Sequence, residues 1–415
     1  MSAARPALTT TGDDAPSRFR QGDRLQLGVV AFSHTVQHLY PGALAIAYPY
    51  VVATYHVSYG TLGVVLGIAG VVGGLLQGAA GLVEGVSSRL LLSLQNLGLA
   101  LFAVLGAAVP SFAAFAAARV GGGIASWPQH PVGNALLVHR FPRRRAFVLA
   151  FHTAGGSFGT AIAPLATGAL IAAYGWRVGL GVFAVPMALG GLVVAALLTD
   201  PPPVPDGAAQ EAPAVAPVRL RDVARRRDVA GALAAGTIAA AGRGLGALST
   251  YLPAYLKTGL RLSPVDVGGL FTVLVVGSIV GPVAAGHVAD RLGRGRVLAA
   301  IYVIGAALMV MFFLAGHDLV LVAVVGLLLG AFAYSESPLL QAVFSDGVEG
   351  APKRGAFGMY FAISYGIGAL WLPLLGWIID AAGFRAAFSV MAGSFVVSAV
   401  VVLATAGPGR RGAPT

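Results

Sequence analysis

Long apolar runs separated by short polar breaks follow one another along the chain, and this pattern limits the folds it can adopt. Only 10% of the 415 residues are charged and 57% are hydrophobic, with a mean hydropathy of +0.81. A soluble protein carries about a quarter charged residues, so this chain cannot cover a water-exposed surface. We therefore expect an all-α membrane protein, in which successive apolar helices cross the bilayer.

A membrane-spanning helix needs roughly 20 apolar residues, and the runs between polar breaks give twelve candidates. They are Leu25–Val52, Gly60–Leu82, Leu90–Ala108, Phe112–Leu137, Ala146–Ala172, Val178–Leu198, Val229–Leu256, Gly268–Val288, Val297–Leu314, Leu319–Phe344, Ala356–Ile379 and Ala386–Thr405. The longest break, 199–228, is rich in proline and alanine and then in arginine, which predicts a cytoplasmic linker. The sequence thus predicts two six-helix bundles, 25–198 and 229–405, with a disordered cytoplasmic tail at 1–24 and a second tail at 406–415.

The positions of lysine and arginine test this count, because cytoplasmic loops carry an excess of both. With a cytoplasmic N-terminus, 21 of the 27 lie on the cytoplasmic side and four on the other, while Arg119 and Arg243 fall inside spans. Both termini are therefore expected in the cytoplasm, with the protein in the cell (inner or plasma) membrane. The formal charge of +11 does not predict nucleic-acid binding, because the arginines recur in short clusters between spans. The chain has no cysteine, which excludes disulfides and thiolate metal sites.

Six short matches, in the same order along each half, indicate an internal repeat. Three of them pair Gly63 with Gly268, Pro164 with Pro373, and Gly175–Arg177 with Gly383–Arg385. The offset between the halves grows only at loops, as a duplication with small insertions would produce. Two such copies are the layout of transporters that rock two bundles around a site at the membrane midplane.

The stretch "GHVADRLGRGRVL" (Gly286–Leu298) lies between two spans of the second half. It resembles, position by position, the loop signature of the major facilitator superfamily, and the resemblance covers nearly the whole chain. The first half has an altered copy, "GLVEGVSSRLLL" (Gly81–Leu92), in which the acid is shifted by one position. The resemblance implies two pseudo-symmetric six-helix bundles, and a role in conformational gating for the polar residues and glycines of these loops. They are Glu84, Arg89, Gly286, Asp290, Arg291, Gly293 and Arg294.

Three further stretches resemble motifs of exporters in that superfamily. "RVGGGIA" (Arg119–Ala125) is similar to the Arg-x-x-Gln-Gly-x-Gly signature of proton-coupled exporters, with Gly122 at the glutamine position. "GGSFGTAIAPLATG" (Gly155–Gly168) has the small-residue spacing of the fifth-span exporter signature, although close helix packing explains that spacing equally well. "QHPVGNALL", followed by "HTAGG", resembles the fosmidomycin-resistance-type branch.

Ionisable and polar side chains inside apolar spans are costly in lipid and usually mark a transport pathway. In the superfamily, spans 1, 4, 7 and 10 line the cavity, and several of these residues fall on such spans. The residues assigned to substrate binding are His38, Gln37, His130, Asn134, Arg243, Glu336 and Tyr365. Those assigned to proton coupling are Glu336, Arg119, His34 and His152. Two alternatives stay open: Glu336 could form a purely structural pair with Arg243 or Arg119, and each histidine could serve only packing.

The sequence therefore predicts a secondary active transporter that works by alternating access and exports a small anionic drug or metabolite in exchange for protons. Its partners would be the substrate, protons and the lipid bilayer, and it is expected to be a monomer. No cofactor, metal site or enzymatic activity is predicted, because the chain has neither a nucleotide-binding phosphate loop nor a His-Glu-x-x-His motif. The alternatives are an organic-anion uptake symporter and a transporter-like membrane receptor without transport.

Overall fold

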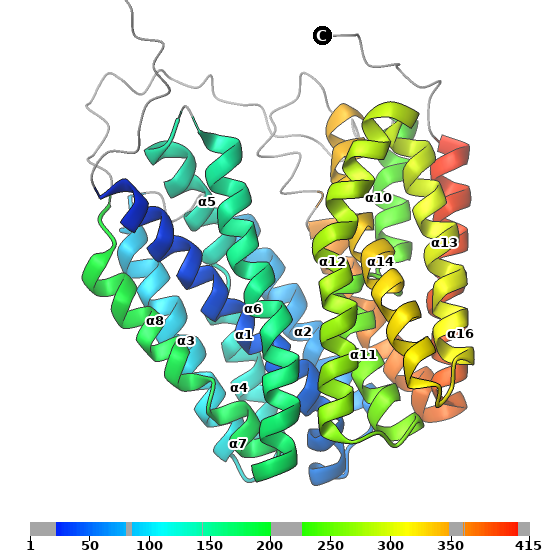
Figure 1. The fold of residues 1–415 in the computed structure, drawn as a ribbon, viewed down its shortest axis with the longest axis horizontal. Helices are drawn as coiled ribbons and strands as arrows, with labels where there is room; N and C mark the ends of the chain where they lie inside the picture. Colours follow the sequence, from blue (N-terminus) through cyan, green and yellow to red (C-terminus); the bar gives the residue numbers. More distant parts are fainter. Residues whose placement is uncertain are drawn as a thin grey trace, which may run out of the picture.

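The helices run side by side in two bundles, which Figure 1 shows next to each other. The computed structural model describes residues 22–79, 85–142, 144–200, 226–347, 360 and 362–405, and every regular element in them is helical. The first bundle contains α1 (Asp23–Tyr55), α2 (Tyr59–Gly78), α3 (Ser88–Ala108), α4 (Phe112–Ala125), α5 (Gln129–Arg140), α6 (Arg145–Tyr174), α7 (Trp176–Gly181) and α8 (Ala184–Leu197). The second contains α10 (Arg227–Ala239), η2 (Gly244–Leu248), α11 (Ser249–Ala254), η3 (Tyr255–Gly259), α12 (Pro264–Leu292), α13 (Arg294–Leu314), α14 (Leu319–Gly347), η4 (Ala362–Ile367), η5 (Gly368–Leu370) and α16 (Trp371–Thr405).

Nine helical stretches of the described residues are long and apolar enough to cross a membrane. The expected first span, α1, is not among them, and it carries several polar side chains along its length. The expected fourth span is divided into α4 and α5 by a turn at 126–128. The stretch Ile363–Thr405 holds both the eleventh and the twelfth expected spans, joined at Gly383. The all-helical membrane architecture is confirmed, whereas the count of twelve spans stays a prediction.

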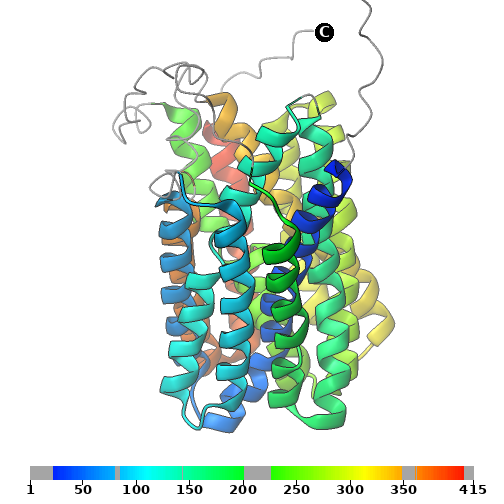
Figure 2. The same ribbon diagram turned by 90° about the vertical axis from the view of Figure 1, so that its left-hand side faces the viewer.

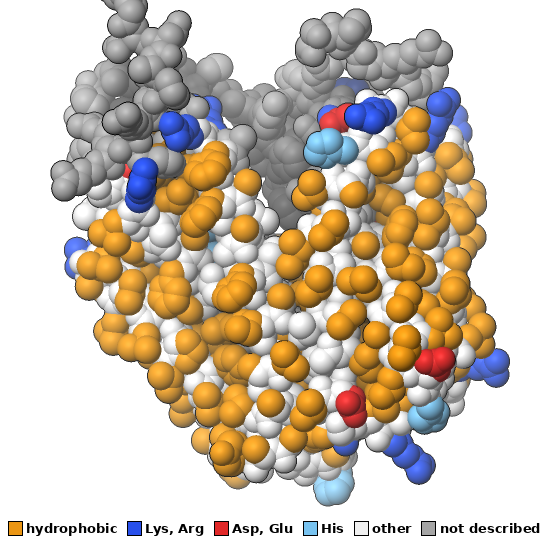
Figure 3. Space-filling view, viewed as in Figure 1, with side chains coloured by type: hydrophobic (Ala, Val, Ile, Leu, Met, Phe, Trp, Pro, Cys, Tyr) orange, Lys and Arg blue, Asp and Glu red, His pale blue; other side chains and the backbone are white. Residues whose placement is uncertain are grey.

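The face shown in Figure 3 has a broad hydrophobic band, with charged side chains toward its two ends. Large apolar side chains stand exposed on the outer helices, including Val280 and Val283 of α12 (64% and 63% exposed) and Leu314 of α13 (67%). A soluble protein does not present so continuous an apolar surface to water, but a bilayer accepts it. The first helix α1 begins, and α16 ends, at the same end of the molecule (Figures 1 and 2).

Two matched glycines of the sequence repeat adopt the same unusual backbone conformation. Gly175, between α6 and α7, has φ 83° and ψ 166°, and Gly383, inside α16, has φ 79° and ψ 176°. Residues with a side chain rarely adopt such a positive φ, whereas glycine does so at little cost. The same tight junction between consecutive spans therefore occurs at corresponding places in the two halves.

The contacts between the bundles follow the same repeat. A Cβ on Gly268 of α12 would lie 2.4 Å from the carbonyl oxygen of Pro164 in α6, and a Cβ on Gly63 of α2 would lie 2.7 Å from Cα of Pro373 in α16. Gly63 and Gly268 are repeat partners, and so are Pro164 and Pro373. The interface of α6 with α12 is therefore the internal-symmetry counterpart of the interface of α2 with α16.

A carboxylate of the second bundle caps a helix of the first. Asp380 of α16 accepts hydrogen bonds from the backbone N–H groups of Tyr59 (2.9 Å) and Gly60 (2.8 Å), at the N-terminus of α2. These donors have no partner within their own helix, and the helix dipole favours a negative charge there. At the other end of α2, a Cβ on Gly74 or Gly78 would have no neighbour within 4 Å. Asp380 thus joins the bundles at the end away from the arginine-rich loops.

Replacing Asp380 by alanine should loosen this end of the molecule. Loss of an N-terminal cap costs about 1 kcal/mol, so we expect the separated population to grow about fivefold. Because the chain has no cysteine, spin labels can be placed at Ala53→Cys and Ala381→Cys alone, and their distance distribution measured. Asp318→Ala is the matched control, because Asp318 accepts from two N–H groups at the start of α14, within one bundle. Equal distributions in the Asp380→Ala variant and the parent would contradict the role of the cap.

Candidate functional site

The seventh expected span is interrupted at the depth of an intramembrane arginine. After α10 ends at Ala239, Arg243 has an extended ψ of 136°, and Gly246 has φ 151°, a value suited to glycine. The first half has a further repeat match here, in which Gly42–Pro49 corresponds to Gly246–Pro253, and Gly42–Pro49 lies within the continuous helix α1. Broken helices at membrane depth occur where protein surrounds the freed backbone or where it lines a transport site. The interruption therefore marks this region as the first candidate site.

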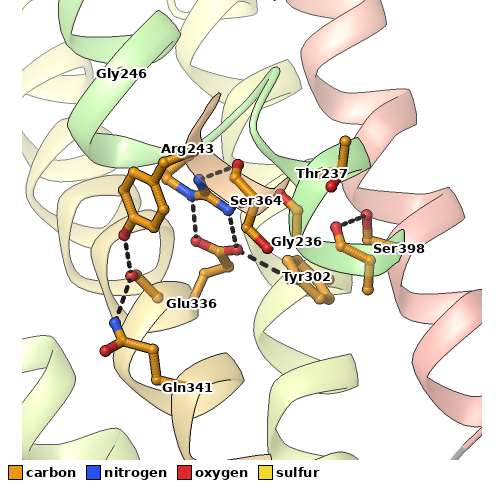
Figure 4. Close-up of polar contacts among 12 residues, drawn as sticks. Gly236, Thr237, Arg243, Gly246, Tyr302, Glu336, Gln341, Ser364 and Ser398 are labelled. Atoms are coloured by element: carbon orange, nitrogen blue, oxygen red, sulfur yellow. Dashed lines mark hydrogen bonds and ion pairs between the residues drawn. The ribbon is translucent and has the colours of Figure 1, made fainter. Parts of the chain in front are cut away.

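Five residues, here called the arginine–glutamate cluster, come together at the interruption (Figure 4). They are Arg243, Tyr302, Glu336, Ser364 and Tyr365. Arg243 binds Glu336 through two parallel hydrogen bonds, Nε to Oε2 at 3.0 Å and Nη2 to Oε1 at 3.1 Å. Tyr302 donates from its hydroxyl to Oε1 of the same carboxylate at 3.2 Å. This two-pronged pairing is the strong form of an arginine–carboxylate contact.

The remaining groups of Arg243 are also occupied. Nη1 donates to the carbonyl oxygen of Ser364 (3.1 Å), Nη2 donates to that of Gly236 (2.6 Å), and the guanidinium carbon lies 4.4 Å from the ring centroid of Tyr365. Arg243 is 3% exposed and Glu336 is 0% exposed. In this conformation both charges are buried against each other, so the cluster is neutral as a unit and neither charge is free for a ligand.

The structure decides between the two partners that the sequence left open for Glu336, in favour of Arg243. The other intramembrane arginine, Arg119, is half-buried in the first bundle and donates from Nε to the hydroxyl of Tyr48 at 2.9 Å. Gly122, at the glutamine position of the exporter-like motif, lies against Tyr40, whose hydroxyl would be 2.3 Å from a Cβ there. That motif position therefore serves close packing in this structure. The proton-coupling role of Arg119 stays a prediction.

Four imidazole rings of the first bundle form a second group, here called the histidine cluster. They are His34 and His38 of α1, His130 of α5 and His152 of α6. The ring centroid of His34 lies 4.6 Å from that of His38, 4.9 Å from that of His130 and 4.1 Å from that of His152. His34, His38 and His130 could hold a metal ion, because their candidate ligand atoms all lie within 4.8 Å of one another. The sequence alone predicts no metal site.

His152 is bonded through both ring nitrogens. Its Nε2 lies 3.0 Å from Nε2 of Gln129, and its Nδ1 lies 3.0 Å from Oδ1 of Asn134. The Gln129 oxygen accepts from Ser33 (2.8 Å) and Gln95 (2.7 Å), so its amide nitrogen is the donor toward the ring. His152 consequently accepts at Nε2 and donates from Nδ1 to Asn134. Asn134, assigned from sequence to the substrate, serves here to hold this ring.

Several members of these networks were not assigned from the sequence. Gln95 and Asn96 of α3 are buried, and Asn96 donates to Ser33 at 2.9 Å. Polar residues on an otherwise apolar span could have indicated a functional role for Gln95 and Asn96. They were not assigned, because α3 is not among the spans expected to line the cavity. Tyr302 is even harder to assign from the sequence, because a single tyrosine in an apolar helix usually serves only to pack against its neighbours. Gln37, assigned to the substrate, is buried on the same helix as His34 and His38.

The residues assigned to gating lie at the arginine-rich end of the helices. Gly293, with φ 92°, forms the turn between α12 and α13, and next to it Asp290 and Arg294 form an exposed ion pair at 3.9 Å. In the first half, the backbone N–H of Arg89 donates to Asp200 at 3.1 Å. Arg291 is exposed and Gly286 has open space beside its Cα, while Glu84 lies outside the described residues. Their role in gating stays a prediction.

Comparison with known families and structures identifies what the chain resembles. A family model described as the Major Facilitator Superfamily matches residues 30–370 and, in a second match, 235–415. No curated protein sequence matches the chain significantly.

Similar solved structures include a mutant of the nucleoside transporter NupG, with 16% identity, 92% of this chain and 99% of that chain covered, and a TM-score of 0.76. A D-xylose–proton symporter has 17% identity, covers 92% and 98%, and has a TM-score of 0.70. A bacterial homologue of the human lysosomal transporter Spinster, inward-facing and occupied, has 15% identity, covers 93% and 96%, and has a TM-score of 0.67. At these identities the likeness shows the fold, and it confirms the expected one.

The buried pair should behave as one energetic unit. Removing one partner from a buried ion pair costs about 3–5 kcal/mol, because the other charge is left unpaired. We expect Arg243→Met and Glu336→Leu each to lower the free energy of unfolding in detergent by that amount. The double variant should lose less than the sum, with a coupling energy of about 1–3 kcal/mol. Arg119→Met is the control, since it removes a bond to a neutral hydroxyl only; additive effects of the two pair substitutions would refute the coupling.

Proposed function

The chain belongs to the Major Facilitator Superfamily, a family of membrane transporters rather than enzymes, and from this premise we propose that it couples the movement of a small anionic molecule to that of protons by alternating access. The observation that carries the proposal is the buried ion pair of Arg243 and Glu336, which lies where the seventh span is interrupted. The proposal places the protein in the cell membrane, with both termini in the cytoplasm.

The pair offers a way to couple the two ligands through charge. When Glu336 binds a proton it loses its negative charge, and the guanidinium of Arg243 is left without a counter-ion in an apolar surrounding. An unpaired buried charge is strongly unfavourable, and a carboxylate or phosphonate of a substrate would replace the lost partner with the same two-pronged geometry. Proton binding at Glu336 and anion binding at Arg243 therefore favour each other, which is the requirement for symport.

The contacts between the bundles fit one of the two states of such a cycle. Asp380 joins α16 to α2 at the end away from the arginine-rich loops, while Gly74 and Gly78 toward the other end have no close neighbour. With the arginine-rich loops in the cytoplasm, this arrangement corresponds to an inward-facing state. Alternating access then requires the Asp380 contact to break and the cytoplasmic ends to approach each other.

Export of an anionic drug or metabolite in exchange for protons is the second candidate. It is favoured by the resemblance of Arg119–Ala125 and Gly155–Gly168 to exporter motifs, and it would agree with the fosmidomycin-resistance-type branch. Antiport needs proton and substrate to compete rather than to bind together, so the sign of proton movement separates the candidates. A receptor without a transport cycle would move neither.

Proton movement in proteoliposomes tests this proposal. With a pH-sensitive dye inside vesicles, each member of a panel of small carboxylates and phosphonates is added outside. Symport should acidify the interior and antiport should make it more alkaline. Glu336→Gln keeps the shape of the carboxyl group but cannot change charge, so we expect at least a tenfold loss of proton movement while exchange of labelled substrate persists. Asp266→Asn, in the exposed first turn of α12, should behave like the parent.

Two results would count against the proposal. Full proton movement in the Glu336→Gln variant would remove Glu336 from the coupling step. A parent protein that moves neither substrate nor protons, with every compound of the panel, would favour the receptor alternative.

A further inference from the structure

The histidine cluster contains a feature that transport of an organic anion does not explain. Three imidazoles from two helices converge, and their candidate ligand atoms lie within 4.8 Å of one another. We propose that His34, His38 and His130 form a binding site for one divalent transition-metal ion of the zinc class. The site lies in the first bundle, whereas the ion pair of Arg243 and Glu336 lies in the second.

The hydrogen bonds of His34 fix which of its nitrogens can bind a metal. Its Nδ1 lies 2.7 Å from the backbone carbonyl oxygen of His152, and a carbonyl oxygen can only accept. The proton is therefore on Nδ1, and Nε2 carries a free lone pair. That Nε2 is buried and has no hydrogen-bond partner among the described residues.

The same reasoning applies to His38 through Thr160. The hydroxyl of Thr160 donates its single proton to the carbonyl oxygen of Gly156 at 3.0 Å. When the hydroxyl gives its proton to that carbonyl, its oxygen accepts from Nδ1–H of His38, 2.7 Å away. In that tautomer the lone pair of His38 is on Nε2, which is also buried and without a partner in the described part of the chain.

Gln37 and Gln95 of the first bundle each have an unpartnered buried oxygen, and Nε2 of His34 and Nε2 of His38 are unpartnered as well, although buried polar groups in proteins are nearly always bonded. A metal ion would satisfy both imidazole nitrogens at once. Metal-binding histidines almost always donate their other ring N–H to a carbonyl or another acceptor, which fixes the tautomer and the ring orientation. His34 and His38 both show this arrangement before any metal is bound.

The glycines of α6 make the room that these rings occupy. A Cβ on Gly156 would lie 2.6 Å from Cε1 of His34, and a Cβ on Gly159 would lie 3.1 Å from Cβ of His38. A larger residue at position 156 would push the ring of His34 out of place, whereas one at position 159 would first meet the backbone carbonyl of Thr35. The small-residue spacing of Gly155–Gly168 therefore serves this site as well as the packing of α6 against α1.

The ligand set indicates the class of metal. Imidazole suits zinc, copper, iron and nickel, whereas magnesium and calcium need oxygen ligands, and the chain has no cysteine that would favour softer ions. A tetrahedral zinc ion holds its ligands about 3.4 Å apart, so the three rings need only a small rotation to close around it. Three histidines leave a fourth position open. His152 cannot fill it, because both of its nitrogens are bonded.

Metal binding by the purified full-length protein tests the proposal. The protein carries an affinity tag without histidine, and Zn²⁺ is titrated calorimetrically while Co²⁺ is followed by its visible absorption. We expect one equivalent of either ion. His38→Gln and His130→Gln should each weaken binding at least 100-fold, and Thr160→Val should weaken it about 10–100-fold through the loss of ring orientation. His317→Gln, an exposed histidine away from the cluster, should bind as the parent does.

Two further measurements keep a misfolded variant from passing as a loss of the site. Each variant must elute as the parent does in size exclusion, and its melting temperature without metal is compared with that of the parent. Zn²⁺ should raise the melting temperature of the parent and of His317→Gln, but not of His38→Gln. Absence of a stoichiometric ion in the parent, or unchanged binding in His38→Gln and His130→Gln, overturns the proposal. Neither result bears on proton-coupled transport, which is measured separately.

Discussion

A polar group inside a lipid bilayer has no water to bond with, so the protein must supply its partner. The interior of this molecule is organised around that constraint. Arg243 uses a carboxylate, two carbonyl oxygens and an aromatic ring, and Glu336 uses Arg243 and Tyr302. In the first bundle, Gln129 connects Ser33, Gln95 and His152 in one network. Among the described residues, the buried atoms without a hydrogen-bond partner include Nε2 of His34, Nε2 of His38 and the side-chain oxygen of Gln95.

Sequence reasoning found the all-helical architecture and the polar residues that interrupt the apolar runs, because apolar runs and charged breaks can be read directly from the chain. It also found the repeat, and the structure places the repeat partners Gly63 and Gly268 against Pro373 and Pro164 in equivalent interfaces. Depth and helix face do not give the rotation of one helix against another. For that reason the pairing of Glu336 with Arg243 rather than Arg119 stayed open, and the approach of three histidines went unseen.

The interruptions of the helices were not predicted from the sequence either. Gly242, Gly244 and Gly246 weaken the helix in the interrupted stretch from Ala240 to Leu248, but Pro41 and Pro49 do not interrupt α1, and the π-helical turn η4 has no signal in a pattern of apolar residues. These irregular segments are stabilised by tertiary contacts, such as the bonds from Arg243 to the carbonyl oxygens of Gly236 and Ser364. Arg243 bonds to the carbonyl oxygens that the interruption leaves free, and those oxygens in turn stabilise the buried guanidinium. The break in the helix and the position of the arginine therefore cannot be predicted separately.

The two halves have equivalent interfaces, but the histidine cluster lies in the first bundle and the arginine–glutamate cluster lies in the second. At the interfaces, backbone meets backbone at glycine, as where Gly168 faces Pro264 and Gly268 faces Pro164. Side chains also meet across the interface, such as Asp380 at the start of α2 and the ring of Tyr59 against that of Tyr251, whereas the histidine cluster and the arginine–glutamate cluster each lie within a single bundle. The arginine–glutamate cluster is nevertheless linked to the interface, because η4, which carries Ser364 and Tyr365, packs against α2 of the first bundle. In the proposed cycle, occupancy of a buried site biases the two bundles only through contacts that differ between the two states, such as the Asp380 cap on α2.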